Sequence, residues 1–125
     1  MASPTAQKLG IRAGATVLVD GPAQEAARLG PLPDGVTVGD PPDADIVIQF
    51  AAGVADVAAT PGLMRRVRAG GRLWVAYRKG ASRRPGGEVP LHRDTLQAAL
   101  EPHGLVGVSL VAIDDTWSAM RVREA

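Results

Sequence analysis

The longest apolar run of the chain, Leu73–Tyr77, lies between Gly70-Gly71 and the basic pair Arg78 and Lys79. An unbroken apolar run bounded in this way is typical of a strand that is buried on both faces. Ahead of it, residues 63–68 place apolar side chains at helical spacing with arginines between them, which predicts a helix leading into the strand. The pattern therefore predicts the central strand of a sheet and the helix that precedes it.

Three further strands are predicted in the first half of the chain, over residues 16–19, 36–38 and 46–50. One helical region joins residues 46–50 to the central strand, and a unit of this kind makes two parallel neighbours through a right-handed crossover. That region covers residues 54–67, and Pro61 is expected to break or kink it because proline removes a backbone donor. The sheet is therefore expected to be at least partly parallel.

Capping residues predict the remaining helices. Ser3-Pro4 offers an N-cap followed by a first-turn proline, and Gly10 is placed to end a short helix. This helix belongs to an N-terminal cap segment, residues 1–14. Helices are also expected over residues 23–29 and 93–100, where apolar positions recur at helical spacing.

Two β-type runs, residues 105–113 and 120–123, close the chain. The connection between them, Asp114-Asp115-Thr116, is short enough only for an antiparallel hairpin. The predicted fold class is α/β: a Rossmann-like three-layer sandwich with a six-stranded, mainly parallel sheet. Its predicted strand order is second, first, third, fourth, sixth, fifth, with only the last strand antiparallel and helices on both faces. A chain of 125 residues is expected to form one domain, residues 1–125.

Composition excludes several classes of function. Fourteen Lys and Arg against thirteen Asp and Glu give a net charge of +1, which argues against the basic footprint of a nucleic-acid binder. With no cysteine and two histidines, the chain cannot assemble a His/Cys zinc site or use a thiolate. No apolar stretch approaches the roughly 18 residues of a membrane span, and the N-terminus lacks a secretory h-region. We therefore expect a cytoplasmic protein with no metal site and no membrane contact.

Residues 63–73 and the closing hairpin resemble a known superfamily. This segment looks like the helix-Gly-Gly-strand passage of S-adenosylmethionine-dependent methyltransferases; its sequence is Leu-Met-Arg-Arg-Val-Arg-Ala-Gly-Gly-Arg-Leu. Nearly the whole chain is also similar to a short bacterial family catalogued only as a domain of unknown function, through residues 8–11, 31–33, 63–73, 74–79 and 115–118. The resemblance implies a reduced methyltransferase-like Rossmann fold and brings no established activity.

The turn after the first strand departs from the methyltransferase pattern. In that superfamily the turn carries an acidic residue and three spaced glycines, because cofactor atoms lie against bare backbone there. Here it reads Asp20-Gly21-Pro22-Ala23-Gln24-Glu25, so at least two glycines are replaced by larger residues. The residues that a cofactor in the usual pose would meet are Asp20, Gly21, Asp40 and Gln49. Asp40, twenty residues after Asp20, suits either a ribose-binding carboxylate or a solvated turn residue.

Ligands of open α/β sheets bind beyond the carboxyl ends of the strands. This rule selects a candidate binding site for a ligand or partner, made of Tyr77, Arg78, Lys79, Asp115, Trp117 and Ser118. Three aromatic residues, Phe50, Tyr77 and Trp117, fall at this edge and either form a pocket or cap the core. Lys79 either binds a ligand or forms an ion pair with Asp114 or Asp115.

No residue pattern of a catalytic site is visible. The chain has no Gly-x-Ser-x-Gly and no phosphate-binding Gly-Lys-Ser/Thr loop, and His92 and His103 are expected to flank a helix rather than to catalyse. Basic residues on the loop after the central strand, Arg83 and Arg84 among them, suit an anion or are simply solvated. The expected function is a non-catalytic methyltransferase-like module that binds a small anionic ligand or a protein partner and has no cofactor, with a homodimer left open. An active S-adenosylmethionine-dependent methyltransferase is the alternative.

Overall fold

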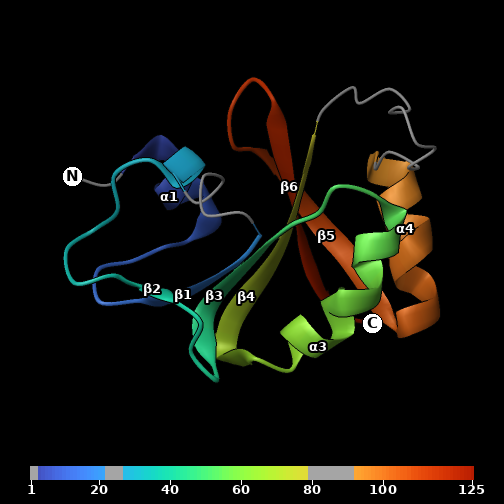
Figure 1. The fold of residues 1–125 in the computed structure, drawn as a ribbon, viewed down its shortest axis with the longest axis horizontal. Helices are drawn as coiled ribbons and strands as arrows, with labels where there is room; N and C mark the ends of the chain where they lie inside the picture. Colours follow the sequence, from blue (N-terminus) through green and yellow to red (C-terminus); the bar gives the residue numbers. More distant parts are fainter. Residues whose placement is uncertain (1–2, 22–26, 79–91) are drawn as a thin grey trace.

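One mixed sheet forms the middle of the molecule in the computed structural model, which describes residues 3–21, 27–78 and 92–125. Its order is β2-β1-β3-β4-β6-β5 (Figure 1). The neighbours of β1 and β3 are parallel, and β6 runs antiparallel to both β4 and β5. The strand order and the single antiparallel strand predicted from the sequence are therefore confirmed. The strands are β1 Thr16–Asp20, β2 Thr37–Gly39, β3 Ala44–Phe50, β4 Val67–Arg78, β5 Leu105–Ala112 and β6 Trp117–Glu124.

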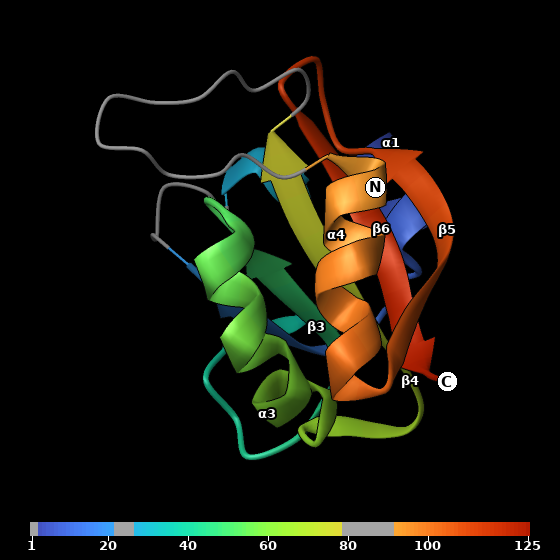
Figure 2. The same ribbon diagram turned by 90° about the vertical axis from the view of Figure 1, so that its right-hand side faces the viewer.

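Helices and 3₁₀ turns cover both faces of the sheet, as predicted. In Figure 2, α3 and α4 lie in front of the strands, with α1 behind them. The α3 and α4 face buries one apolar cluster around Leu73 and Val75, and the α1 face buries a second around Ile48 and Trp74. The elements are α1 Pro4–Leu9, η1 Ala27–Leu29, η2 Val54–Ala59, α3 Thr60–Met64, α4 Arg93–Leu100 and η3 Glu101–His103.

The apolar run of β4 is buried on both sides. Leu73, Val75 and Tyr77 face α3 and α4, whereas Trp74 and Ala76 face α1. All five side chains are at most 6% exposed. Because successive strand residues point to opposite faces, a strand between two helical layers needs apolar residues at every position, which is the reason for the unbroken run.

Capping and one buried indole hold α1 at the start of the chain. The Ser3 hydroxyl accepts a hydrogen bond from the Ala6 amide at 3.0 Å, and Gly10 ends the helix at φ +81°. The Trp74 Nε1 group donates to the Leu9 carbonyl oxygen at 3.0 Å. The predicted N-cap and stop are confirmed, and the end of α1 is tied to the central strand.

The helical region before β4 is shorter than predicted. Pro61 lies in the first turn of α3, directly after η2 ends, so the predicted break is confirmed. The expected continuation of the helix to Val67 is wrong, because Val67 pairs with Ala44 as the first residue of β4. The pairing then moves to Ile46 with Arg72, so β4 bulges over residues 68–71.

Two sequence-based expectations involve residues outside the described ranges. The helix predicted over residues 23–29 is described only from Ala27, where it is a 3₁₀ turn. The basic loop with Lys79, Arg83 and Arg84 lies outside the described residues. Within those ranges, none of the helices has the length and apolar character that crossing a bilayer requires, and the same residues contain no cluster of metal-ligating side chains.

Candidate functional site

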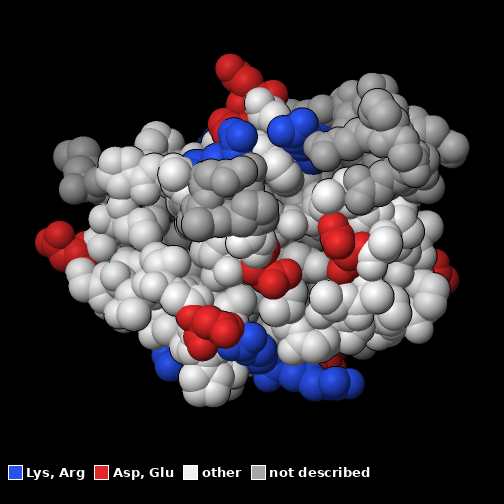
Figure 3. All heavy atoms as spheres, in the orientation of Figure 1, with Lys and Arg blue, Asp and Glu red and all other residues white. Residues whose placement is uncertain are grey.

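Strands β4 and β6 bring several predicted site residues together at the carboxyl edge of the sheet. Arg78 pairs across the ladder with Trp117, and Tyr77 pairs with Ser118. The hairpin that contains Asp115 joins β5 to β6 at this same edge. In Figure 3, basic side chains lie beneath an acidic tip at the upper end of the molecule, which is where this hairpin lies in Figure 1.

Trp117 is the centre of a stacked cluster. Its side chain is 5% exposed and meets Phe50 edge to face, with ring centroids 5.3 Å apart. The guanidinium carbons of Arg28 and Arg78 lie 5.6 and 5.7 Å from the Trp117 ring centroid. Cation–π contacts of this kind contribute roughly 0.5–1 kcal/mol when exposed and more when water is excluded.

Asp114 fixes the turn that carries Trp117. Its Oδ1 atom accepts hydrogen bonds from the amides of Thr116 and Trp117, both at 2.8 Å, as in an Asx-turn. Its Oδ2 atom accepts a hydrogen bond from Arg28 at 3.1 Å. Burial alone would raise the pKa of Asp114, but the two amides and Arg28 outweigh it and hold the pKa below its ordinary value.

The cluster has unused binding capacity. The Nε1 group of Trp117 is buried, and none of the described residues accepts a hydrogen bond from it. A buried donor left without an acceptor costs about 1–3 kcal/mol. In the described part of the chain, Arg78 also has no carboxylate within ion-pair distance. The edge therefore presents a positive charge and a donor for which the described residues supply no acceptor.

The other predicted ligand residues are placed differently. Tyr77 belongs to the cluster beneath α4 and not to the Trp117 cluster. Burial raises its pKa, opposed by the charge of Arg93. Of the three aromatic residues expected to share the edge, only Phe50 and Trp117 touch. Ser118 is half-buried and Asp115 is exposed, and the predicted contact of Lys79 with this turn lies outside the described residues.

The four residues expected to meet a cofactor are largely occupied by other contacts. Gln49 is 1% exposed; its amide donates to the Asp56 carbonyl oxygen and accepts from the Thr60 hydroxyl, both at 2.7 Å. The Asp40 carboxylate accepts a hydrogen bond from Arg66 at 2.6 Å. Arg66 directly precedes β4, at the amino edge of the sheet, so this carboxylate is held toward the end opposite the candidate site.

Asp20 and Gly21 lie at the carboxyl edge, as does Gln49, which pairs with Asp20. Asp20 is exposed, and a Cβ atom at Gly21 would lie 3.0 Å from Cβ of Phe50. Gly21 thus allows the turn to approach Phe50 closely, instead of leaving bare backbone for a ligand. Among the described residues, the side chains of Asp40 and Gln49 are therefore engaged in other contacts, whereas the Asp20 carboxylate is exposed.

Arg28 is a site residue that sequence analysis missed. It lies in η1, which follows β1, and the only available signal was its place within the first strand–helix unit. Contacts with Asp114 and Trp117 span more than eighty residues of sequence. No local pattern indicates such a contact.

Several solved structures with the same architecture are methyltransferases by name, and one is a cyclase. A SAM-dependent methyltransferase from Aquifex aeolicus matches with a TM-score of 0.58 and 14% identity over 99% of this chain and 95% of that one. The CcbJ methyltransferase from Streptomyces caelestis matches with a TM-score of 0.60 and 12% identity over 97% and 88%. The [4+2]-cyclase SpnF matches with a TM-score of 0.57 and 11% identity over 96% and 78%.

These similarities show that the chain has the methyltransferase-like Rossmann fold predicted for it. No protein-family model matches the sequence, and no curated protein matches it either. The resemblance to a short bacterial family therefore stays a prediction. Since one structure of this architecture is a cyclase by name, the fold alone does not decide the chemistry.

Proposed function

We propose that this protein is a cytoplasmic, non-catalytic methyltransferase-like module that binds a small anionic ligand at the carboxyl edge of its sheet. Arg78 and Trp117 are the principal ligand residues, and Arg28 supports them. The observation that carries the proposal is the stack of two guanidinium groups over an indole whose buried N–H group has no acceptor among the described residues. Lys79, Asp115 and Ser118 are proposed to line the same site.

Electrostatics and desolvation both favour an anion at this place. Arg28 already binds Asp114, so the unneutralised charge of the described stack is that of Arg78. A carboxylate or phosphate oxygen would form a charge-assisted hydrogen bond with Arg78, which is stronger than a neutral one. An oxygen that also reached Nε1 of Trp117 would supply the missing acceptor. Phe50, packed against the indole, provides an apolar neighbour for the carbon part of the ligand.

The alternative function is an active S-adenosylmethionine-dependent methyltransferase. The fold similarity favours it. The occupied side chains of Gln49 and Asp40 and the contact between Gly21 and Phe50 favour the non-catalytic function. A protein partner that presents a carboxylate to Arg78 would use the same chemistry as a small anion.

Isothermal titration calorimetry with S-adenosylmethionine and S-adenosylhomocysteine separates the two functions. The non-catalytic module is expected to show no binding at micromolar concentrations of either compound. Binding with a micromolar dissociation constant, about −8 kcal/mol, would overturn the proposal in favour of the methyltransferase.

Benzoate, a carboxylate with a flat apolar body, is the probe for the anion site. We expect saturable binding to the wild-type protein, weakened at least about tenfold in Arg78→Gln, which removes one charge-assisted contact. Arg123→Gln is the matched control, because Arg123 is an exposed residue near the end of β6 and loses the same charge away from the site. Equal binding by both variants would contradict the role assigned to Arg78.

A further inference from the structure

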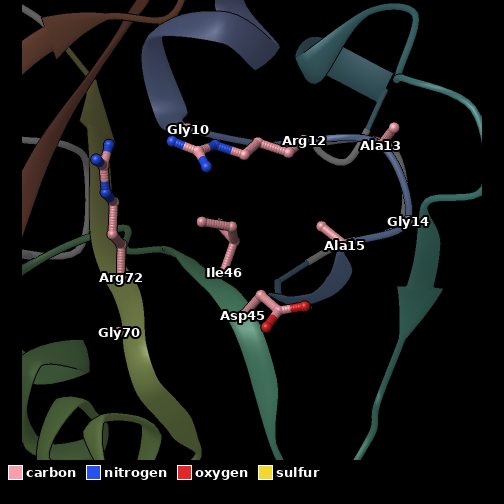
Figure 4. Close-up of a pocket in the computed structure, with 9 residues that line it drawn as sticks. All are labelled: Gly10, Arg12, Ala13, Gly14, Ala15, Asp45, Ile46, Gly70 and Arg72. Carbon is pink, nitrogen blue, oxygen red and sulfur yellow. The ribbon is translucent and has the colours of Figure 1, made fainter.

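A pocket of about 360 Å³ lies at the opposite, amino edge of the sheet (Figure 4). The loop between α1 and β1 forms one wall, and the starts of β3 and β4 form the other. Ile46 lies between the walls, and the Arg12 side chain extends across the opening toward the side from which Arg72 rises. No aromatic residue is among those that line the pocket.

Glycines give the pocket its shape. A Cβ atom at Gly10 would lie 2.7 Å from Nη1 of Arg72, so the guanidinium group packs against the bare end of α1. On the β4 side, Gly70 has φ +80°, and a Cβ atom at Gly71 would lie 2.5 Å from the Asp45 carbonyl oxygen. The Gly-Gly pair within β4 thus builds the bulge beside the pocket.

The charges in the pocket are not balanced. Asp45, the carboxylate in the lining, already accepts hydrogen bonds from the Thr16 amide at 2.9 Å and from Arg68 at 3.3 Å. Within the described ranges, neither Arg12 nor Arg72 has a hydrogen bond or an ion pair through its guanidinium group. Two guanidinium groups therefore share one pocket without a carboxylate partner among the described residues, although other arginines at this end, such as Arg66, are paired.

We propose that this pocket binds a small phosphate monoester, with Arg12 and Arg72 on the phosphate and the carbon part over Ile46. Each guanidinium group presents several N–H donors in a planar fork, which matches the oxygens of a phosphate. The volume of about 360 Å³ lies at the small end of the range for ligand pockets, roughly 300–1,000 Å³. This site is independent of the proposed anion site at the carboxyl edge.

The test follows the two indole N–H signals of the chain by ¹⁵N NMR during titration with glycerol 3-phosphate at constant ionic strength. The Trp74 indole donates to Leu9, next to Gly10 and Arg72, and so reports on this pocket, as does the amide of Gly14 in its lining. We expect both signals to shift and saturate with one dissociation constant, whereas the Trp117 indole reports on the carboxyl edge and any shift it shows is fitted separately.

Two variants and a control make the test specific. Arg72→Gln and Arg12→Gln are each expected to raise the dissociation constant at least about tenfold. Arg12 is an exposed loop residue, so its variant keeps the fold even where Arg72→Gln does not. Arg65→Gln removes a charge at the same end of the molecule from a residue outside this lining and should leave the constant unchanged.

Three outcomes would overturn the site. They are the absence of saturable shifts, equal shifts with glycerol alone, and unchanged binding in Arg12→Gln. Equal affinity for succinate would overturn the preference for phosphate. Because the Trp117 indole is read in the same spectra, failure at the amino edge is distinguishable from failure at the carboxyl edge.

Discussion

At the scale of single residues, Asp114 has the widest influence on the candidate site. One carboxylate oxygen binds two turn amides and the other binds Arg28, so the turn, the indole and one of the two stacked cations depend on it. Sequence analysis placed Asp114 in a short connection and named it as a possible ion-pair partner of Lys79, but not of Arg28. The reason is that Arg28 reaches it from the other end of the chain, through the fold.

Replacing Asp114 tests this role through stability. At pH 7, Asp114→Ala is expected to cost roughly 1–2 kcal/mol, the sum of lost hydrogen bonds and a surface ion pair. Asp114→Asn should cost less, because the amide oxygen still accepts from Thr116 and Trp117. Urea unfolding of both variants measures the difference, and an equal loss in the two would contradict the turn-fixing role.

The pH dependence has a definite sign. The pKa of Asp114 is lower in the folded protein than its ordinary 3.8, so its charge stabilises the fold above that value and the contribution is lost as the pH falls through the folded pKa. The gap between wild type and Asp114→Asn should therefore be present at neutral pH and close as the pH falls through the folded pKa of Asp114. A stability difference that persists at acid pH would show that the charge of Asp114 does not contribute to stability.

Gln49 shows what an edge position alone cannot predict. Sequence analysis placed it near the ligand edge, and it does lie near the end of β3, but its side chain faces η2 and α3 and bonds Asp56 and Thr60. The direction of the Gln49 side chain follows from its alternation with Ile48 and Phe50, whereas its hydrogen-bond partner depends on the helix above it. The place of Gln49 near the end of the strand was thus predictable, whereas the hydrogen bonds that occupy its side chain were not.

Thr60→Val tests the occupancy of Gln49. The variant keeps the shape of the side chain but leaves the buried Oε1 atom without its donor, and it should cost about 1–3 kcal/mol in thermal or urea unfolding. Thr60→Ser retains the hydroxyl and is the control, with a smaller loss. Equal stability of Thr60→Val and wild type would mean that the hydrogen bond contributes nothing.

At the scale of elements, the centre of β4 was predictable and its beginning was not. The apolar run between two helical layers predicts a buried strand and nothing else. Residues 65–68, in contrast, combine arginines and Val67 at a spacing that predicts a helix. Pairing with β3 decides the conflict: the Arg66 carbonyl oxygen accepts from the Ala44 amide at 2.8 Å, and Val67 then joins the ladder. Tertiary hydrogen bonds override the local preference here.

Two glycine variants test the bulge. In Gly71→Ala the new Cβ atom would meet the backbone oxygens of Asp45 and Arg68 at 2.5 and 2.9 Å, so a loss of roughly 1–3 kcal/mol is expected. Gly62→Ala is the matched control within α3, where no atom lies within 4 Å; it should stabilise by roughly 0.5–1 kcal/mol. Calorimetric Tm values measure both, and a Gly71→Ala protein as stable as wild type would contradict the close approach.

At the scale of the whole molecule, strand direction is predictable from the sequence because residues 21–36, 51–66 and 79–104 are long enough for crossovers between parallel strands. The short connection at residues 114–116 permits only a hairpin, which makes β6 antiparallel to β5; β6 also pairs with β4 on its other side. The functional surfaces do not follow in the same way. The binding roles proposed for Arg28, Arg12 and Arg72 depend on contacts that form only when the fold brings α1, η1 and the sheet together.

The most direct test of the central claim reads the Trp117 indole N–H signal while the protein is titrated with benzoate and, separately, with S-adenosylmethionine. The chain has two tryptophans, and Trp74, whose N–H group is already bonded to Leu9, is the internal reference. If the protein binds an anion at the carboxyl edge, benzoate should shift the Trp117 signal to saturation and leave the Trp74 signal unchanged. Micromolar S-adenosylmethionine should shift neither signal. A saturable response to S-adenosylmethionine, or a Trp117 signal that benzoate leaves in place, would contradict it.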